Sequence, residues 1–333
     1  MTIPARSTIR LIVWQQCLTQ SFSGQDENVF PVLFSEKDQY EPRRCSNVRL
    51  QLHDARTIGA NGRRRGMQLH VIEQGPERSS GKLPVVFLHG LFGRARNFGA
   101  LQRRVAADRR TLALDLRNHG GSPHGMMTYD LMAEDVRETL AARDALPALV
   151  IGHSMGGKTA MRLALAHPET VAGLLVADIA PTPRPFSQDG LVAALRGVRF
   201  PARLDLREAK ALLAEAIPDA AVRELMAQNL RLGDDPGWAI GLEEIAASLP
   251  TLYDWPERSA ARYDGPTLFV RGGRSDYVRD DDLPAIRRFF PAARIETIPE
   301  AGHWVHVEAP ERFAALMLDF IADVADEDRA GTP

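Results

Sequence analysis

The sequence predicts an α/β fold in which a mostly parallel central sheet is flanked by helices. From Met67 onward, short apolar runs alternate with amphipathic stretches, which is typical of a sheet covered by helices. The chain has 333 residues, of which 44% are hydrophobic, so it is long enough for one large domain with an insertion. Its 41 basic and 43 acidic side chains nearly cancel, so no net field favours nucleic acid.

Seven apolar runs have the length of strands, and five stretches between them carry apolar residues at helical spacing. The predicted strands are Gln68–Glu73, Pro84–Leu88, Thr111–Leu116, Ala148–Gly152, Val171–Asp178, Thr267–Arg271 and Arg294–Ile298. The predicted helices are Arg96–Ala107, Tyr129–Arg143, Met155–Ala166, Asp281–Phe290 and Pro310–Val324. We therefore expect a core made of residues 67–181 and 266–325, followed by a C-terminal tail at 326–333.

Residues 182–265 interrupt the alternation of strands and helices. Their pattern is that of several amphipathic helices, which we expect to be broken by turn-forming residues. These are Pro201, Pro218, Gly233, Pro236 and Pro250. An insertion at this place can roof a pocket and exclude water, or it can pad the edge of the sheet. We expect a helical cap over the functional site.

The first 66 residues show no sustained strand or helix period, so we expect a flexible extension, with a partner-binding arm as the alternative. Its apolar run Leu11–Trp14 is too short for a secretion signal or a membrane span. Cys17 and Cys45 are the only cysteines, so disulfides do not define the fold, and a cytoplasmic location is expected. The sequence does not determine the oligomeric state, which can be a monomer or a dimer.

The segment Gly152–Gly157 reads Gly-His-Ser-Met-Gly-Gly and stands between a predicted strand and a predicted helix. A nucleophile elbow needs this arrangement, because its serine occupies a tight turn and nearby glycines let the backbone pass. The segment therefore predicts Ser154 as a catalytic nucleophile.

A second glycine-containing bend, His89–Gly93, follows the strand Pro84–Leu88. Such a bend can point a backbone N–H into the pocket, and we expect the N–H groups of Leu91 and Met155 to form an oxyanion hole. The helix that begins at Met155 adds a favourable dipole. We expect His89 to be structural, with its ring hydrogen-bonded to loop backbone. The residues expected to line the substrate site are His89, Gly90, Phe92, His153 and Trp304.

The general base is expected late in the chain, after the last strand, because such hydrolases carry serine, acid and histidine in that order. His303 lies there in Gly302-His303-Trp304. His306 competes with it, but His303 follows a glycine in a loop from which its side chain can turn back toward the elbow. We predict His303 as the base and His306 as a loop or helix-cap residue.

Two carboxylates compete for the third position. Asp276 follows the strand Thr267–Arg271 and stands three residues after Gly273, a common spacing for the acid in such enzymes. Asp178 ends the strand that follows the predicted elbow and its helix. Either side chain could reach the histidine, and either could be an ordinary surface or capping carboxylate.

From about Met67 to its C-terminus, the chain resembles the YbfF-type esterases of the α/β-hydrolase superfamily. The resemblance rests on His89–Gly93, Asp115–Gly120, Gly152–Lys158, Asp178–Pro181 and Gly302–His306. It implies an α/β-hydrolase fold and a carboxylesterase, also active on thioesters, that needs no cofactor. It also implies that Asp178 is the acid, since in that family the later loop reads Gly-Gly-x-Ser-x-Tyr-Val. This chain keeps that loop but has Asp276 at its second variable position, so Asp276 stays the alternative.

The sequence thus predicts a serine esterase that acts on small-molecule esters with short-to-medium acyl chains. The alternatives are a thioesterase, another Ser-His-Asp hydrolase that cleaves amide or carbon–carbon bonds, and a non-catalytic binding protein of the same fold. Asp280, Asp281 and Asp282 lack the nearby histidines that a metal site would need. No phosphate-binding lysine loop and no complete dinucleotide fingerprint is present.

Overall fold

The computed structural model describes residues 67–76, 81–183, 188–256 and 261–330, and describes residues 325–330 by their backbone. The N-terminal extension expected at 1–66 lies outside the described residues.

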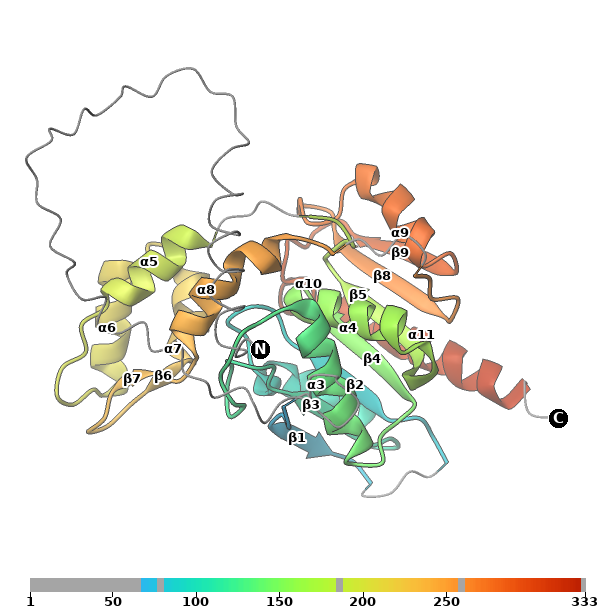
Figure 1. The fold of residues 1–333 in the computed structure, drawn as a ribbon, viewed down its shortest axis with the longest axis horizontal. Coiled ribbons are helices and arrows are strands. Elements are labelled where there is room, and N and C mark those ends of the chain that lie inside the picture. Colours follow the sequence, from blue (N-terminus) through green and yellow to red (C-terminus); the bar gives the residue numbers. More distant parts are fainter. Residues whose placement is uncertain (1–66, 77–80, 184–187, 257–260, 331–333) are drawn as a thin grey trace, which may run out of the picture. The chain divides into compact units, whose positions relative to one another are not determined.

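The described residues form a seven-stranded sheet in the order β1-β3-β2-β4-β5-β8-β9 (Figure 1). Its strands are β1 (Val71–Gln74), β2 (Val85–Leu88), β3 (Thr111–Leu114), β4 (Ala148–His153), β5 (Val171–Ala177), β8 (Thr267–Gly272) and β9 (Ala293–Ile298). Neighbouring strands are parallel, except that β1 runs antiparallel to β3. The predicted mostly parallel sheet is confirmed, and each predicted strand overlaps an observed one.

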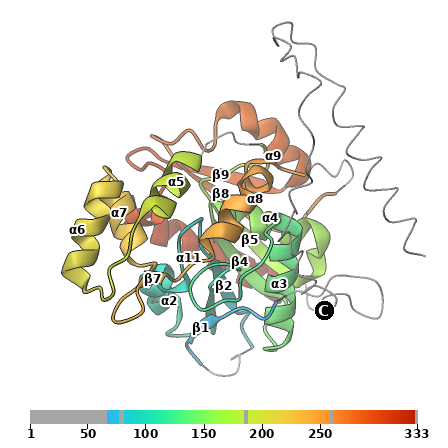
Figure 2. The same ribbon diagram turned by 60° about the vertical axis from the view of Figure 1, so that its left-hand side comes forward.

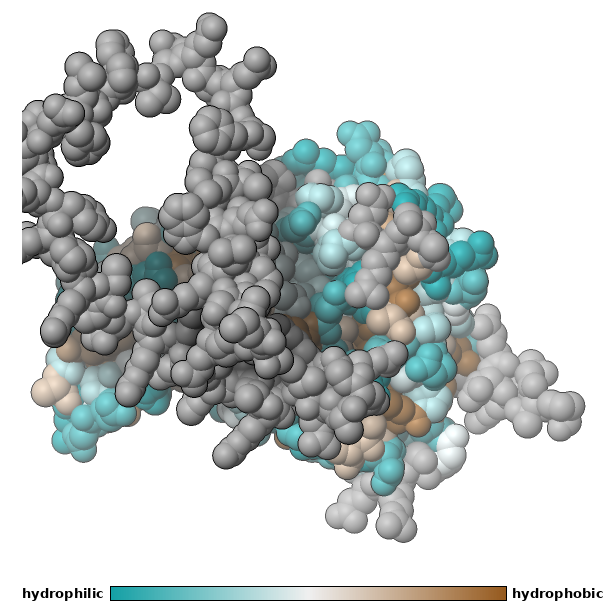
Figure 3. All heavy atoms as spheres, in the orientation of Figure 1, coloured by the Kyte–Doolittle hydropathy of each residue, from teal (hydrophilic) through white to brown (hydrophobic). Residues whose placement is uncertain are grey.

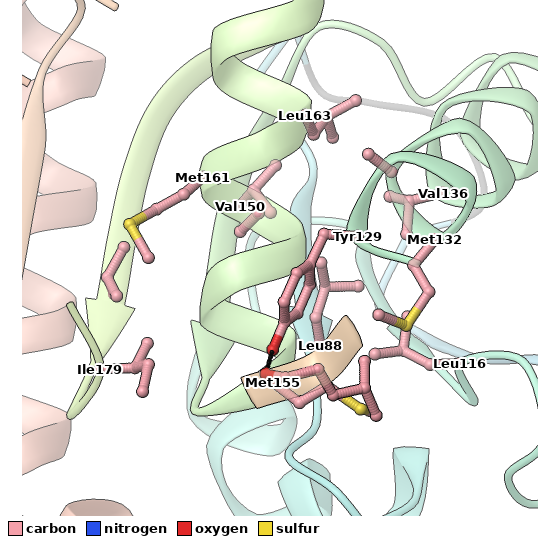
Figure 4. Packing of buried hydrophobic residues seen from close by; sticks show 14 of the residues in the cluster. Leu88, Leu116, Tyr129, Met132, Val136, Val150, Met155, Met161, Leu163 and Ile179 are labelled. Atoms are coloured by element: carbon pink, nitrogen blue, oxygen red, sulfur yellow. Dashed lines mark hydrogen bonds between the residues drawn. The ribbon is translucent and has the colours of Figure 1, made fainter. Parts of the chain in front are cut away.

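Helices cover both faces of this sheet, because alternate side chains of each central strand point to opposite sides. Val86 and Leu88 of β2 belong to one apolar cluster, which also holds residues of α3 (Tyr129–Ala141), α4 (Met155–Ala166) and α9 (Leu283–Phe289). Val85 and Phe87 belong to a second cluster, with α2 (Gly99–Val105) and α11 (Pro310–Ala330). Figure 4 shows part of the first cluster, with Val136 of α3, Met161 of α4 and Val150 of β4 among its labelled residues.

Four of the five predicted helices differ in extent from the observed ones, and the one predicted over Tyr129–Arg143 ends earlier, at Ala141. The stretch Arg96–Ala107 is divided into the 3-10 turn η1 (Ala95–Phe98) and α2, and Asp281–Phe290 into η3 (Asp280–Asp282) and α9. The helix predicted over Pro310–Val324 instead continues to Ala330, into the segment expected as a C-terminal tail. Residues 326–330 lack glycine and proline, so nothing in them stops a helix. Two short helices, η2 (Pro168–Thr170) and α10 (Val305–Glu308), complete this part of the chain.

Within residues 182–265 lie α5 (Asp189–Gly197), α6 (Leu206–Ala216), α7 (Ala220–Ala227) and α8 (Leu242–Tyr253). Helices α5, α6 and α7 gather to one side of the sheet in both ribbon views (Figures 1 and 2). A small antiparallel pair, β6 (Leu230–Arg231) and β7 (Gly237–Trp238), was not expected; its turn contains Gly233 and Pro236.

The helix break expected at Pro250 was wrong, because this proline lies inside α8. Its ring is exposed, while Leu249 and Leu252 on the same helix are buried. Apolar burial of that helix face therefore outweighs the backbone hydrogen bond that proline removes.

On the face shown in Figure 3, hydrophobic residues outside the grey parts form small patches among hydrophilic ones. Among the helices of the described residues, none has the length and hydropathy required to cross a bilayer.

Helix α4 packs so closely on the sheet that Gly156 has no room for a side chain. A Cβ added there would stand 2.2 Å from the Leu88 carbonyl oxygen of β2. We expect Gly156→Ala to destabilise the fold by about 3 kcal/mol, the upper range for overpacking. Chemical denaturation measures this.

Gly190→Ala in α5 is the matched control, because a Cβ there meets nothing within 4 Å. Alanine favours a helix over glycine, so this variant should gain about 0.5–1 kcal/mol. Equal effects of the two substitutions would contradict the close packing of α4.

Candidate active site

Ser154 stands alone between β4, which ends at His153, and α4, which begins at Met155. Its φ of 53° and ψ of −118° are rare for a residue with a side chain. Hydrogen bonds hold this turn from both sides: the Ser154 N–H donates to the Ala177 oxygen at 3.0 Å, and the Lys158 N–H to the Ser154 oxygen at 3.0 Å. The predicted strand-to-helix turn is therefore present, and it exposes the Ser154 hydroxyl at the end of β4.

His303, in the loop between β9 and α10, connects two side chains that are distant in sequence. Its Nε2 lies 3.0 Å from the Ser154 Oγ, at a distance where it can accept a hydrogen bond from the hydroxyl. Its Nδ1 lies 2.8 Å from Asp178 Oδ2 and donates to that carboxylate. The carboxylate thus fixes the tautomer in which Nε2 is free to accept a proton.

The structure brings Asp178, and not Asp276, to the histidine. Asp178 directly follows β5, its side chain is 0% exposed, and its Oδ1 accepts the Gly272 N–H at 2.9 Å. The Asp276 side chain is 78% exposed, and its nearest cation is the Arg279 Nε at 3.7 Å. Asp178 follows β5, which is the neighbour of β4, whereas Asp276 follows β8, which is one strand farther away. Only Asp178 therefore lies next to the serine turn.

Two site residues were missed by sequence reasoning. The Ser275 hydroxyl donates to Asp178 Oδ2, the same oxygen that binds His303. The Tyr277 ring stacks on the His303 ring, with centroids 3.6 Å apart and planes 18° from parallel. Burial raises the pKa of the Tyr277 phenol, so the ring stays neutral. The only available signal was the loop pattern Gly272–Val278, which contains both residues but gives neither a role.

The bend after β2 passes directly over the serine. A Cβ added to Gly90 would stand 3.3 Å from the Ser154 Cβ and 2.9 Å from the His153 Nδ1, so this close approach requires glycine. Within the described ranges, the N–H groups of Leu91 and Met155 have no hydrogen-bond acceptor in the protein. Both are therefore available to a negatively charged oxygen.

The neighbouring histidines are bound by protein groups: His89 and His153 hydrogen-bond to backbone atoms, and His306 packs against His153. His89 donates from Nδ1 to the Gly90 oxygen at 2.8 Å and accepts the Leu116 N–H on Nε2 at 2.9 Å, as expected. His153 donates from Nε2 to the His303 carbonyl at 2.9 Å. Burial lowers the pKa of His306 to about 4, and its ring packs against His153 with centroids 4.6 Å apart. His306 therefore packs against His153, and it is His303 that reaches the serine.

Ser154 and His303 open into a cavity of about 630 Å³, a size typical of small-molecule sites. All five residues expected to line the substrate site, His89, Gly90, Phe92, His153 and Trp304, line this cavity. Leu191 of α5, Leu225 of α7 and Leu252 of α8 add apolar walls. Across the described part of the chain, no three His, Cys, Asp or Glu side chains are grouped to hold a metal ion.

Comparisons with known proteins agree with this architecture. The model of the alpha/beta hydrolase family matches residues 85–316. The chain is 39% identical to the sn-1-specific diacylglycerol lipase ABHD11 of Mus musculus, over 72% of this chain and 80% of that protein. It is 31% identical to the esterase YbfF of Escherichia coli, over 77% of this chain and all of that protein (100%).

Among solved structures, a marine microorganism esterase superposes with a TM-score of 0.72 and 32% identity, covering 77% of this chain and 100% of that one. Family model, relatives and structure agree, and the chain belongs to the α/β-hydrolase family as an esterase of the YbfF type.

Proposed function

We propose that this chain hydrolyses carboxylic esters with Ser154 as nucleophile, His303 as general base and acid, and Asp178 as the carboxylate that orients the histidine. The continuous hydrogen-bonded line from Asp178 Oδ2 through His303 to the Ser154 Oγ carries the proposal. The names of the relatives support the reaction class, because they include an esterase and a diacylglycerol lipase.

In the first step, the Ser154 Oγ attacks the carbonyl carbon of the ester while its proton moves to His303 Nε2. The carbonyl oxygen becomes an alkoxide, which accepts hydrogen bonds from the N–H groups of Leu91 and Met155. When the alkoxide collapses, the bond to the leaving alcohol breaks and the alcohol takes the proton from His303. An acyl group is then joined to Ser154.

In the second step, water replaces the alcohol. His303 Nε2 takes a proton from the water as its oxygen bonds to the acyl carbon, and the same oxyanion hole holds the new alkoxide. Collapse breaks the acyl bond to Ser154, whose oxygen recovers the proton from His303. Asp178 stays ionised throughout and stabilises the imidazolium that forms in each step.

The cavity favours a small-molecule ester with a short-to-medium acyl chain. Its walls are largely apolar, and polar groups converge at Ser154 and His303, as in sites that bind the apolar part of a ligand and orient its reacting group. We propose that residues 182–265 act as a cap, because α5, α7 and α8 supply walls of this cavity.

Removal of the nucleophile tests the proposal directly. Ser154→Ala should lower the turnover of p-nitrophenyl butyrate by about 10⁴-fold or more, because no oxygen is left to accept the acyl group. Circular dichroism should show an unchanged fold. A fluorophosphonate probe should label the wild type and not the variant, and activity retained by the variant would refute Ser154 as the nucleophile.

The two carboxylates give opposite expectations. Asp178→Asn should lower kcat by about 10³- to 10⁴-fold, because the amide no longer stabilises the imidazolium or fixes its tautomer. Asp276→Asn is the matched control in the neighbouring loop, and its exposed side chain should leave kcat within about twofold. Steady-state kinetics at pH 7.5 decides, and the reverse ranking would assign the role to Asp276.

Chain length and linkage define the substrate class. In a series of p-nitrophenyl esters from acetate to palmitate, kcat/KM should peak at short-to-medium chains, because the cavity volume limits the acyl group. Matched acyl thioesters should react more slowly than the oxygen esters. Faster thioester turnover would instead identify a thioesterase.

A further inference from the structure

Asn229 reaches from the end of α7 into the bend that carries Leu91. The residue is 1% exposed, and its Nδ2 donates to the Phe92 carbonyl oxygen at 2.6 Å and to the Leu225 oxygen at 3.3 Å. Its Oδ1 is buried and has no partner among the described residues. A buried amide that leaves its acceptor unsatisfied costs stability, so its donor side is the part that the structure uses.

The contact at Phe92 continues through two peptide groups. The Phe92 carbonyl shares a peptide with the Gly93 N–H, which donates to the Gly90 oxygen at 2.9 Å. The Gly90 carbonyl in turn shares a peptide with the Leu91 N–H. The C=O and N–H of a trans peptide point in opposite directions. A chain of hydrogen bonds therefore runs from the Asn229 amide through these two peptide groups and ends at the Leu91 N–H. Hydrogen bonds linked in this way polarise one another.

Phe92 itself is held in a conformation that it would not adopt alone. Its φ of 62° lies in the left-handed region, which disfavours bulky residues. The Phe92 N–H donates to His119 Nε2 at 3.1 Å, and His119 Nδ1 donates to the Arg117 oxygen at 2.8 Å. Burial lowers the pKa of His119 to about 3, so its Nε2 remains an acceptor near neutral pH. His119 and Asn229 thus fix Phe92 from both sides.

We propose that Asn229 is a positioning residue of the oxyanion hole, which aligns and polarises the Leu91 N–H through the peptides of Gly93 and Gly90. The inference rests on the proposed function, since it gives Leu91 the role of oxyanion donor. It also means that residues 182–265 contribute to catalysis, because the side chain that begins this line follows α7.

The test compares two variants that each remove one buried hydrogen bond between residues 182–265 and the core. Asn229→Ala removes the donor to Phe92. Ser248→Ala is the matched control: Ser248 is 4% exposed, accepts the Met127 N–H at 3.1 Å and does not line the cavity. Each variant is assayed for kcat and KM with p-nitrophenyl butyrate, for thermal unfolding, and for inhibition by an alkyl trifluoromethyl ketone. The Ser154 Oγ adds to the carbonyl carbon of this ketone while its proton moves to His303. The resulting hemiketal alkoxide is stabilised by hydrogen bonds from the oxyanion hole.

We expect Asn229→Ala to lower kcat by about 10- to 100-fold. This loss is no larger than the loss in kcat that follows removal of an oxyanion donor. KM should stay within about twofold of the wild-type value. The affinity for the trifluoromethyl ketone should fall by the same factor as kcat. Ser248→Ala should lower the unfolding temperature and leave kcat and ketone affinity unchanged. Asn229→Leu, which keeps the approximate shape of the side chain without its donor, should behave like Asn229→Ala and serves if the alanine variant does not fold.

An active wild type whose Asn229 variants keep the wild-type kcat and ketone affinity would overturn the positioning role alone. Equal losses in the Asn229 and Ser248 variants would also overturn it, because the effect would then follow general stability. A wild type without turnover that depends on Ser154 would overturn the proposed function first, and the role of Asn229 with it.

Discussion

The hydrogen-bonded line from Asp178 through His303 to Ser154 is the constraint on which the site depends, and the order of the strands makes it possible. Ser154 follows β4, Asp178 follows the adjacent β5, and His303 lies in the loop after β9, with β8 between them. Parallel strands bring their carboxyl ends to one edge of the sheet. Residues separated by 125 and 149 positions therefore meet within 3.0 Å.

This edge concentrates backbone strain. Ser154, Asp178 and Phe92 all have positive φ values, of 53°, 51° and 62°, although none is glycine. Such conformations persist only where the surroundings over-determine them. Here the buried strands β4 and β5 hold the first two, and hydrogen bonds from His119 and Asn229 hold the third. The buried strands thus hold the backbone of Ser154 and Asp178 in these conformations, and this fixes the directions of their side chains.

The helical insertion does more than line the cavity, because its residues also bind the bend over the serine and the residues that follow the bend. Gln228 accepts hydrogen bonds from Arg94 through its carbonyl oxygen at 2.5 Å and from Asn97 through its side chain at 2.8 Å. Asn229, the next residue, binds Phe92. The segment that closes α7 is therefore joined to the bend at Phe92 and to the residues just after it at Arg94 and Asn97, so hydrogen bonds connect the insertion to the loop that carries the expected oxyanion donor.

The sequence by itself determined the sheet and the serine turn and pointed to His303 in the loop after the last strand, because these depend on periodicity and on residues adjacent in the chain. Only the tertiary structure decided that Asp178 and not Asp276 reaches the histidine. The tertiary structure alone also revealed the contacts of Ser275, Tyr277 and Asn229 and the position of Pro250 inside α8. Each of these depends on which strand ends and helix faces become neighbours in space, and that order arises from burial of apolar surface between segments far apart in sequence.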